Sequence, residues 1–186
     1  MALKPTIYKF RINLSDLNRD YYDSFNLTVA QHPSEKLERM AVRVLAFCLN
    51  AEKNLLFTKG LSTVEEPDLW ARSVDNRISL WIEVGEPESS RIKKAIRMAE
   101  TVKVYSFNTK SDVWWRQGQA RFRDLLASFF RFQWQDVQAF AALVNRTMEL
   151  SVTVSGSAAY VAAAAGEIEL SWQTLQQVAS DSENPD

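Results

Sequence analysis

Two acidic residues on neighbouring predicted strands have the types and spacing of a metal site. Glu83 lies in the apolar run 78–84, where an ionised side chain is costly to bury unless it is paired or bound to a metal. Asp68 starts the preceding predicted strand, 67–73, and a turn at 75–76 joins the two strands into a hairpin. Two carboxylates with open water positions suit Mg²⁺ or Mn²⁺. Such an ion activates water and neutralises charge that develops on a phosphate, and a nearby lysine adds to that stabilisation.

Each carboxylate also has a structural interpretation. Asp68 follows a proline, and aspartates in that position are common turn or cap residues. An ion pair with Arg39 or Lys94 would satisfy Glu83 as well as a metal would. Both interpretations stay open from the sequence.

The sequence lacks the motifs of several large enzyme classes. It contains no GxxxxGK[ST] phosphate loop, no GxGxxG, no HExxH and no GxSxG. Its one histidine, His32, comes just before a predicted helix, which favours a capping or packing role over catalysis. Because Cys48 is the only cysteine, the chain forms no internal disulfide and no thiolate metal cluster. These absences disfavour kinases, cofactor-dependent dehydrogenases and zinc proteases.

The composition is that of a soluble globular protein. The chain has 186 residues, of which 46% are hydrophobic and 24% charged. We expect a single α/β domain over residues 1–179 and an acidic, disordered tail over 180–186. The N-terminus has no apolar signal-peptide core, and the run 158–165 is far shorter than the ~20 residues that span a bilayer. A cytoplasmic protein without a membrane partner is expected, and the sequence predicts no oligomeric state.

Charge is distributed unevenly, although the formal net charge is only −1. Between Arg91 and Arg131, basic residues outnumber acidic residues by 10 to 3. The arginines from 116 to 131 are interleaved with phenylalanines, a combination that could line a nucleic-acid groove. A solvated basic surface is the structural alternative. Nucleic acid is therefore a candidate partner.

Hydrophobic periodicity predicts an α/β fold. Alternation over 6–13, followed by a second strand over 21–29, predicts an N-terminal hairpin, and helical spacing over 34–52 predicts the first helix. A predicted strand at 78–84, helix at 91–101 and strand at 102–107 have the lengths of a parallel βαβ unit. Further helices are expected at 112–118 and 135–146, and further strands at 55–57, 125–134, 148–154, 159–164 and 167–172.

Taken together, these motifs resemble the YaeQ family of bacterial proteins. The resemblance rests on His32-Pro-Ser-Glu35, Glu66-Pro-Asp-Leu-Trp70, Trp81-Ile-Glu-Val-Gly85, Arg91-Ile-Lys-Lys94-Ala95 and Val104-Tyr-Ser-Phe107. The same region looks like a degenerate PD-(D/E)xK nuclease motif, with Asp68 and Glu83 as its carboxylates. The resemblance implies a restriction-endonuclease-like fold, in which helices flank a mixed central sheet. In this chain we expect additional N- and C-terminal β-hairpins.

The resemblance also implies roles for particular residues. Glu35, from the first core helix, would join Asp68 and Glu83 as a metal ligand, with Glu38 as the second choice. The lysine of the motif is replaced by Gly85, and its substitute is expected on the following helix at Lys94, or else at Lys93 or Arg91.

Two functions from different classes follow. The first is a divalent-metal-dependent nuclease, a phosphodiesterase with Glu83, Asp68 and Lys94 as catalytic residues. In it Arg91, Lys93 and Arg116 would bind the nucleic-acid backbone. The second is a catalytically inactive protein on the same fold that binds nucleic acid or another protein. Its carboxylates would be held in ion pairs with residues such as Arg39, Arg43 and Lys94.

Overall fold

The computed structural model describes residues 4–59, 61 and 63–179, and within them ten strands form one mixed sheet. The sheet order is β2-β1-β8-β9-β10-β7-β6-β5-β4-β3. The strands are β1 (Thr6–Asp16), β2 (Tyr21–Gln31), β3 (Leu55–Phe57), β4 (Leu69–Arg72), β5 (Ile78–Val84), β6 (Ala99–Ser106), β7 (Ser128–Phe132), β8 (Thr147–Ser155), β9 (Ala158–Ala163) and β10 (Gly166–Gln176). The helices of this described part are α1 (Leu37–Leu49), α2 (Ser89–Met98), α3 (Ser111–Phe122) and α4 (Trp134–Leu143).

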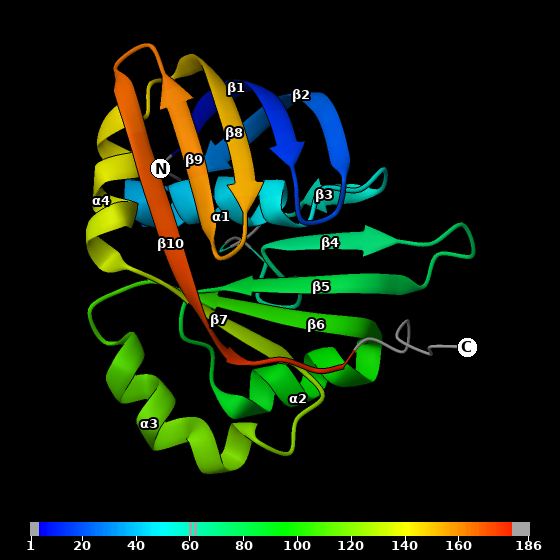
Figure 1. Ribbon diagram of the computed structural model, residues 1–186. Coiled ribbons are helices and arrows are strands. Elements are labelled where there is room, and N and C mark those ends of the chain that lie inside the picture. Colours follow the sequence, from blue (N-terminus) through cyan, green and yellow to red (C-terminus); the bar gives the residue numbers. More distant parts are fainter. Residues whose placement is uncertain (1–3, 60, 62, 180–186) are drawn as a thin grey trace.

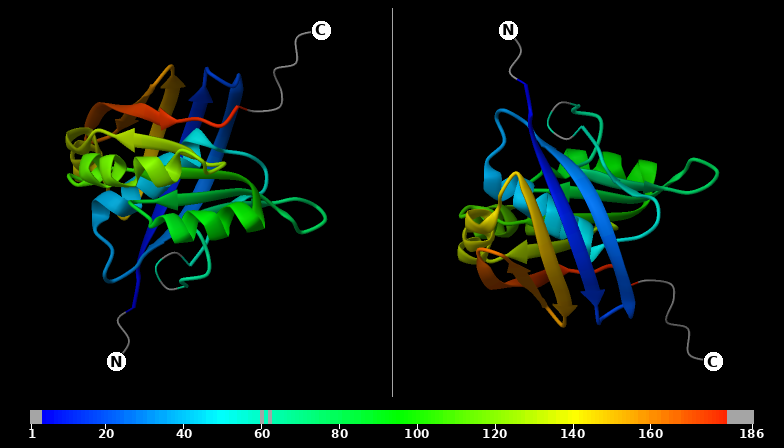
Figure 2. Two further views of the ribbon diagram at one scale, coloured as in Figure 1. Left: turned by 90° about the horizontal axis from the view of Figure 1, so that it is seen from below. Right: turned by 90° about the horizontal axis from the view of Figure 1, so that it is seen from above.

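The sheet is strongly curved and nearly closed, and α1 lies inside the curve (Figures 1 and 2). Residues 40–48 of α1 are all buried, as expected for a helix that is surrounded by apolar side chains. The main core joins α1 and α4 to side chains from both halves of the sheet, such as Ile12 of β1 and Ile82 of β5. Long strand β10 connects the halves, because it pairs with β9 at one end and with β7 at the other.

A second core lies on the outer face of β5, β6 and β7, where α2 and α3 pack (Figure 1). Trp81, Val104 and Phe129 contribute to it from the three strands, and Ile92 contributes from α2. Because side chains alternate along a strand, Ile82 points toward α1 and its neighbours Trp81 and Glu83 point toward α2. This alternation brings Glu83 to the α2 side of the sheet.

Many of the local predictions are confirmed. The mixed α/β class, the N-terminal hairpin and the parallel β5-α2-β6 unit are all present. The predicted turn between β4 and β5 contains Asn76 with a positive φ of 63°. The predicted C-terminal strands correspond to β8, β9 and β10, which pair in antiparallel order. The predicted tail, 180–186, lies outside the described residues.

Some boundaries were predicted wrongly. The first helix begins at Leu37 rather than 34, because the His32–Ser34 turn precedes it. The predicted strand 125–134 is only Ser128–Phe132, and the next helix begins at Trp134. The terminal hairpins are not additions to a separate sheet, because β1 pairs in parallel with β8 and both belong to the main sheet.

Among the described residues, no helix has both the length and the apolar character needed to cross a membrane.

Candidate functional site

Glu83 is a buried carboxylate at the carboxyl end of β5. The residue is only 4% exposed. Its Oε1 accepts hydrogen bonds from Nε1 of Trp81 and from Nε of Arg91, each at 2.8 Å. Burial raises the pKa of Glu83 and the negative charge of Asp68 adds to the rise, whereas the bonds from Arg91 and Trp81 oppose it. Glu83 is therefore held in a site where ionisation is disfavoured by its surroundings.

Asp68 lies directly before β4 and faces the same strand end. It is 2% exposed. Its Oδ2 accepts the backbone N–H of Val84 at 2.7 Å, and its own N–H donates to the carbonyl of Ile82 at 3.0 Å. These bonds continue the β4–β5 hairpin by one step and place Asp68 close enough to Glu83 for their charges to interact. The predicted convergence of the two side chains at one end of the hairpin is present in the structure.

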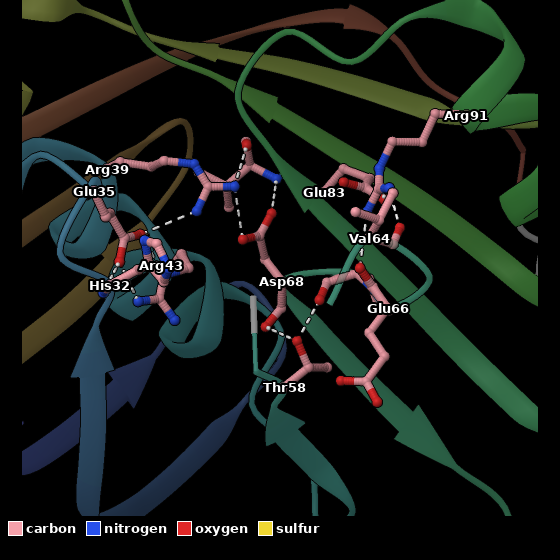
Figure 3. Close-up of polar contacts among 12 residues, drawn as sticks. His32, Glu35, Arg39, Arg43, Thr58, Val64, Glu66, Asp68, Glu83 and Arg91 are labelled. Atoms are coloured by element: carbon pink, nitrogen blue, oxygen red, sulfur yellow. Dashed lines mark hydrogen bonds and ion pairs between the residues drawn. The ribbon is translucent and has the colours of Figure 1, made fainter. Parts of the chain in front are cut away.

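Glu35 belongs to the same region but is separated from Asp68 by an arginine. Its Oε1 accepts from Arg39 at 3.0 Å and from Arg43 at 2.8 Å, and its Oε2 accepts from Arg43 at 2.7 Å. Arg39 also pairs with Oδ1 of Asp68 at 2.8 Å (Figure 3). Burial lowers the pKa of Arg39, but Asp68 and Glu35 together raise it above its ordinary value. Glu35 and Asp68 are thus linked through a guanidinium group.

Arg91, on the first turn of α2, is the cation that contacts Glu83. Its Nη1 and Nη2 donate to the carbonyls of Val64 and Glu66 at 2.6 and 2.8 Å (Figure 3). Lys94 lies one turn later and pairs with Glu65. The sequence suggested Arg39 or Lys94 as the ion-pair partner of Glu83. Both suggestions were wrong, because the partner is Arg91.

The remaining predicted site residues lie elsewhere on the surface. Lys93 is exposed on α2, and Arg116 is exposed on α3, where its Nε donates to the carbonyl of Asp112 in the same helix. Neither residue lines the cleft that contains Asp68 and Glu83. Sequence reasoning missed the carbonyls of Val64 and Glu66, because backbone groups leave no signal in residue types.

The two carboxylates line a cleft of about 430 Å³. It opens at the carboxyl ends of the parallel strands β5 and β6, the usual position of ligand sites in open α/β sheets. Its lining includes Arg39, Asp68, Glu83, Gly85, Arg91 and Asn108. A larger hollow of about 810 Å³ lies along β1, β2 and β8, but its only acidic side chain, Glu149, is exposed and paired with Arg11.

Gly85 directly follows β5, at the position where the resemblance to a PD-(D/E)xK motif led us to expect a lysine. Its φ is +115°, a conformation that residues with a Cβ rarely adopt, although the space around the missing Cβ is open. A lysine there would be strained by the backbone rather than by crowding. A cation can reach Glu83 from α2 instead, as Arg91 does.

The acidic side chains of this cleft fit a metal site to which the protein contributes few ligands. Among the described residues, no group of three or more His, Cys, Asp or Glu side chains could hold a metal ion. Asp68 and Glu83 remain as a pair, and the hydrogen bonds from Trp81 and Arg91 to Glu83 both go to its Oε1. Mg²⁺ is commonly held by one or two carboxylates together with substrate phosphates. The pair is therefore compatible with Mg²⁺ or Mn²⁺.

Comparison with known proteins gives one consistent result. A family model described as "YaeQ protein" matches residues 1–172. The chain is 38% identical to the uncharacterised YaeQ protein of Salmonella typhi and 36% identical to that of Escherichia coli K12. Each match covers 95% of this chain and 99% of the relative.

Two solved structures are similar along nearly the whole chain. The YaeQ protein of Xanthomonas axonopodis pv. citri is 34% identical with a TM-score of 0.88, and the match covers 92% of this chain and 98% of that one. The YaeQ protein of Pseudomonas syringae is 33% identical with a TM-score of 0.89, covering 94% and 97%.

The buried Glu35–Arg43 pair allows a direct test of the ion network. Arg43→Met should lower the free energy of unfolding by about 3–5 kcal/mol, because it leaves a buried carboxylate without its main partner. The side chains of Arg43 and Glu35 are 3% and 1% exposed. Urea unfolding measures the change. Arg11→Met, which removes an exposed ion pair with Glu149, is the matched control and should have a much smaller effect. Equal effects of the two substitutions would contradict the described network.

The raised pKa of Glu83 predicts a pH-dependent effect of Glu83→Gln. Because the folded protein binds this proton more tightly than the unfolded chain does, stability is lost as pH rises past the ordinary value of 4.5. The glutamine variant does not ionise, so its stability relative to wild type should increase from pH 4 to pH 7. Urea unfolding at both pH values measures the difference, with Glu149→Gln as an exposed control. An unchanged difference would show that Glu83 ionises normally.

Proposed function

The chain belongs to the YaeQ family, and we propose that its buried carboxylate pair is the centre of a divalent-metal-dependent phosphodiesterase that acts on nucleic acid. The observation that carries this proposal is the burial of Asp68 and Glu83 together in one cleft. Adjacent buried carboxylates destabilise each other, and proteins keep such pairs mainly at functional sites.

The arrangement of β3 to β7 supports a restriction-endonuclease-like scaffold for this centre. These strands are adjacent in chain order, with β4 antiparallel to both of its neighbours and β5, β6 and β7 parallel. Helix α1 packs on one face and α2 and α3 pack on the other. The motif resemblance implies a mixed sheet flanked by helices, so this arrangement supports the proposal. Within it, Asp68 precedes the antiparallel strand and Glu83 lies near the end of the next strand.

In this proposal Asp68 and Glu83 hold Mg²⁺ or Mn²⁺, with Glu35 positioning Asp68 through Arg39. A bound ion would activate water and neutralise charge on the phosphate. Arg91 places a guanidinium beside Glu83 and is suited to binding phosphate, because its planar group donates two parallel hydrogen bonds. It therefore takes the role that the sequence assigned first to Lys94. Lys94, which is paired with Glu65, and the exposed Lys93 and Arg116 would contact more distant phosphates.

The second candidate is a binding protein without catalysis, and one observation favours it. Both carboxylates already have a cationic partner, since Arg39 pairs with Asp68 and Arg91 pairs with Glu83. A site neutralised in this way needs no metal to be stable. Exposed basic side chains on α2 and α3, such as Arg97 and Arg121, would then supply a surface for nucleic acid.

Metal binding separates the two candidates. Isothermal titration calorimetry with Mn²⁺ should show binding to the wild-type protein at millimolar or lower concentration. Asp68→Asn and Glu83→Gln should each weaken it at least about tenfold, because each removes one of two anionic ligands. Glu66→Gln is the matched control, since Glu66 lines the same cleft but contributes no ligand.

Each outcome has a definite meaning once circular dichroism has verified that the variants fold. If the wild type does not bind Mn²⁺, or if Glu83→Gln binds it equally well, the metal-dependent proposal fails. Fluorescence anisotropy with a labelled oligonucleotide then tests the second candidate in the absence of metal.

A further inference from the structure

A partly buried lysine on β6 lies outside the cleft, and it forms no ion pair with a carboxylate of the described residues. The register places Lys103 between Ile82 of β5 and Ser128 of β7. Its Nζ donates to Oδ1 of Asn50 at 2.7 Å. Within the described part of the chain, no carboxylate lies within ion-pair distance of this amine. Buried lysines are normally paired with an acid, so a lysine bonded only to an amide is unusual.

Asn50 holds the amine beside a tyrosine. It follows α1 directly and is 4% exposed. Its Nδ2 donates to Oη of Tyr105 and to the carbonyl of Ala46, each at 2.8 Å. Because both amide hydrogens are used in this way, Oδ1 is fixed toward Lys103. The Lys103 amine and the Tyr105 hydroxyl therefore contact the same amide group.

The charged groups around Lys103 do not favour its protonated form. Burial lowers its pKa, and the positive charge of Arg19 in the β1–β2 turn lowers it further, against an opposing effect of Glu52 after α1. Arg19 is fixed there by Asp16 and by the carbonyl of Ala51. The residues in register with Lys103 on the neighbouring strands, Ile82 and Ser128, carry no charge.

Tyr105 keeps its proton at neutral pH. Burial raises its pKa to about 12, although the bond from Asn50 and the charge of Arg19 oppose the rise. Its oxygen accepts from Asn50, so its own O–H is available as a donor. The site thus combines an amine, a hydroxyl donor and a fixed amide.

We propose that Lys103 is a nucleophilic lysine that captures small aldehydes as an imine. The nitrogen lone pair attacks the carbonyl carbon, a C–N bond forms, and the carbonyl electron pair moves to oxygen. In this proposal the Tyr105 hydroxyl, which contacts the same amide as the amine, donates a hydrogen bond to that oxygen. It leaves as water with the two hydrogens of the amine, and a C=N bond remains. The step needs no oxidant or reductant, and it is independent of Asp68 and Glu83.

Trapping with an aldehyde tests this proposal on the intact protein. The wild type is treated at pH 7 with glycolaldehyde and sodium cyanoborohydride, and modification at each lysine is measured by peptide mass spectrometry over time. Lys103 should react severalfold faster than Lys110, an exposed lysine in the same sample. The modification rate of Lys103 should also reach half of its maximum at a lower pH than that of Lys110, because more of the Lys103 amine is neutral at a given pH. Modification of Lys103 no faster than that of Lys110 would overturn the proposal.

A variant separates amine chemistry from simple accessibility. Asn50→Asp places a carboxylate against Nζ, which favours the charged amine and should remove the advantage of Lys103 over Lys110. Circular dichroism and urea unfolding establish that the variant is folded. A folded variant that reacts at the wild-type rate would contradict the proposed role of the neutral amide. The wild-type comparison decides the proposal if the variant does not fold.

Discussion

The pairing of Arg39 with two buried carboxylates fixes the geometry on which the candidate site depends. Arg39 extends from the first turn of α1 and contacts Glu35, Asp68 and the carbonyl of Val84. It therefore ties the segment before α1 to the start of β4 and the end of β5. Without this cation, three elements would meet through carboxylates that repel one another. The position of Asp68 beside Glu83 follows from this constraint.

The same constraint explains why each of these buried carboxylates lies beside an arginine. Each of Glu35, Asp68 and Glu83 is less than 10% exposed, and each is paired with at least one guanidinium. A buried carboxylate without such a partner would strongly destabilise the fold. Burial and the charge of Asp68 raise the pKa of Glu83 despite its pairing with Arg91. Functional sites commonly retain such locally unfavourable groups where chemistry or binding requires them.

Sequence patterns predicted the parts of this molecule that depend on local order. The β4–β5 hairpin places Asp68 and Glu83 together because a short turn joins their strands, and short turns have recognisable residues. The parallel pairing of β1 with β8 was not predicted, since it joins residues far apart in the chain. Curvature of the sheet around α1 depends on that pairing. The local hydrophobic periodicity of the sequence contains no information about the pairing of β1 with β8.

The sequence also did not indicate which basic residue of α2 would reach the cleft. Ile92 and Ala95 are buried against the sheet, and this packing fixes the rotation of the helix. Arg91, in the first turn, then reaches Glu83, and Lys94 reaches Glu65. Lys103 was overlooked because it is one of several polar residues in the sequence of β6. Its significance depends on Asn50, which lies 53 residues earlier.

The central claim is that Asp68 and Glu83 form one metal site, and anomalous diffraction tests it most directly. Crystals grown with Mn²⁺ should show an anomalous peak in contact with carboxylate oxygens of both residues. A peak only at exposed carboxylates, with Glu83 still bonded to Arg91 and Trp81, would contradict the claim.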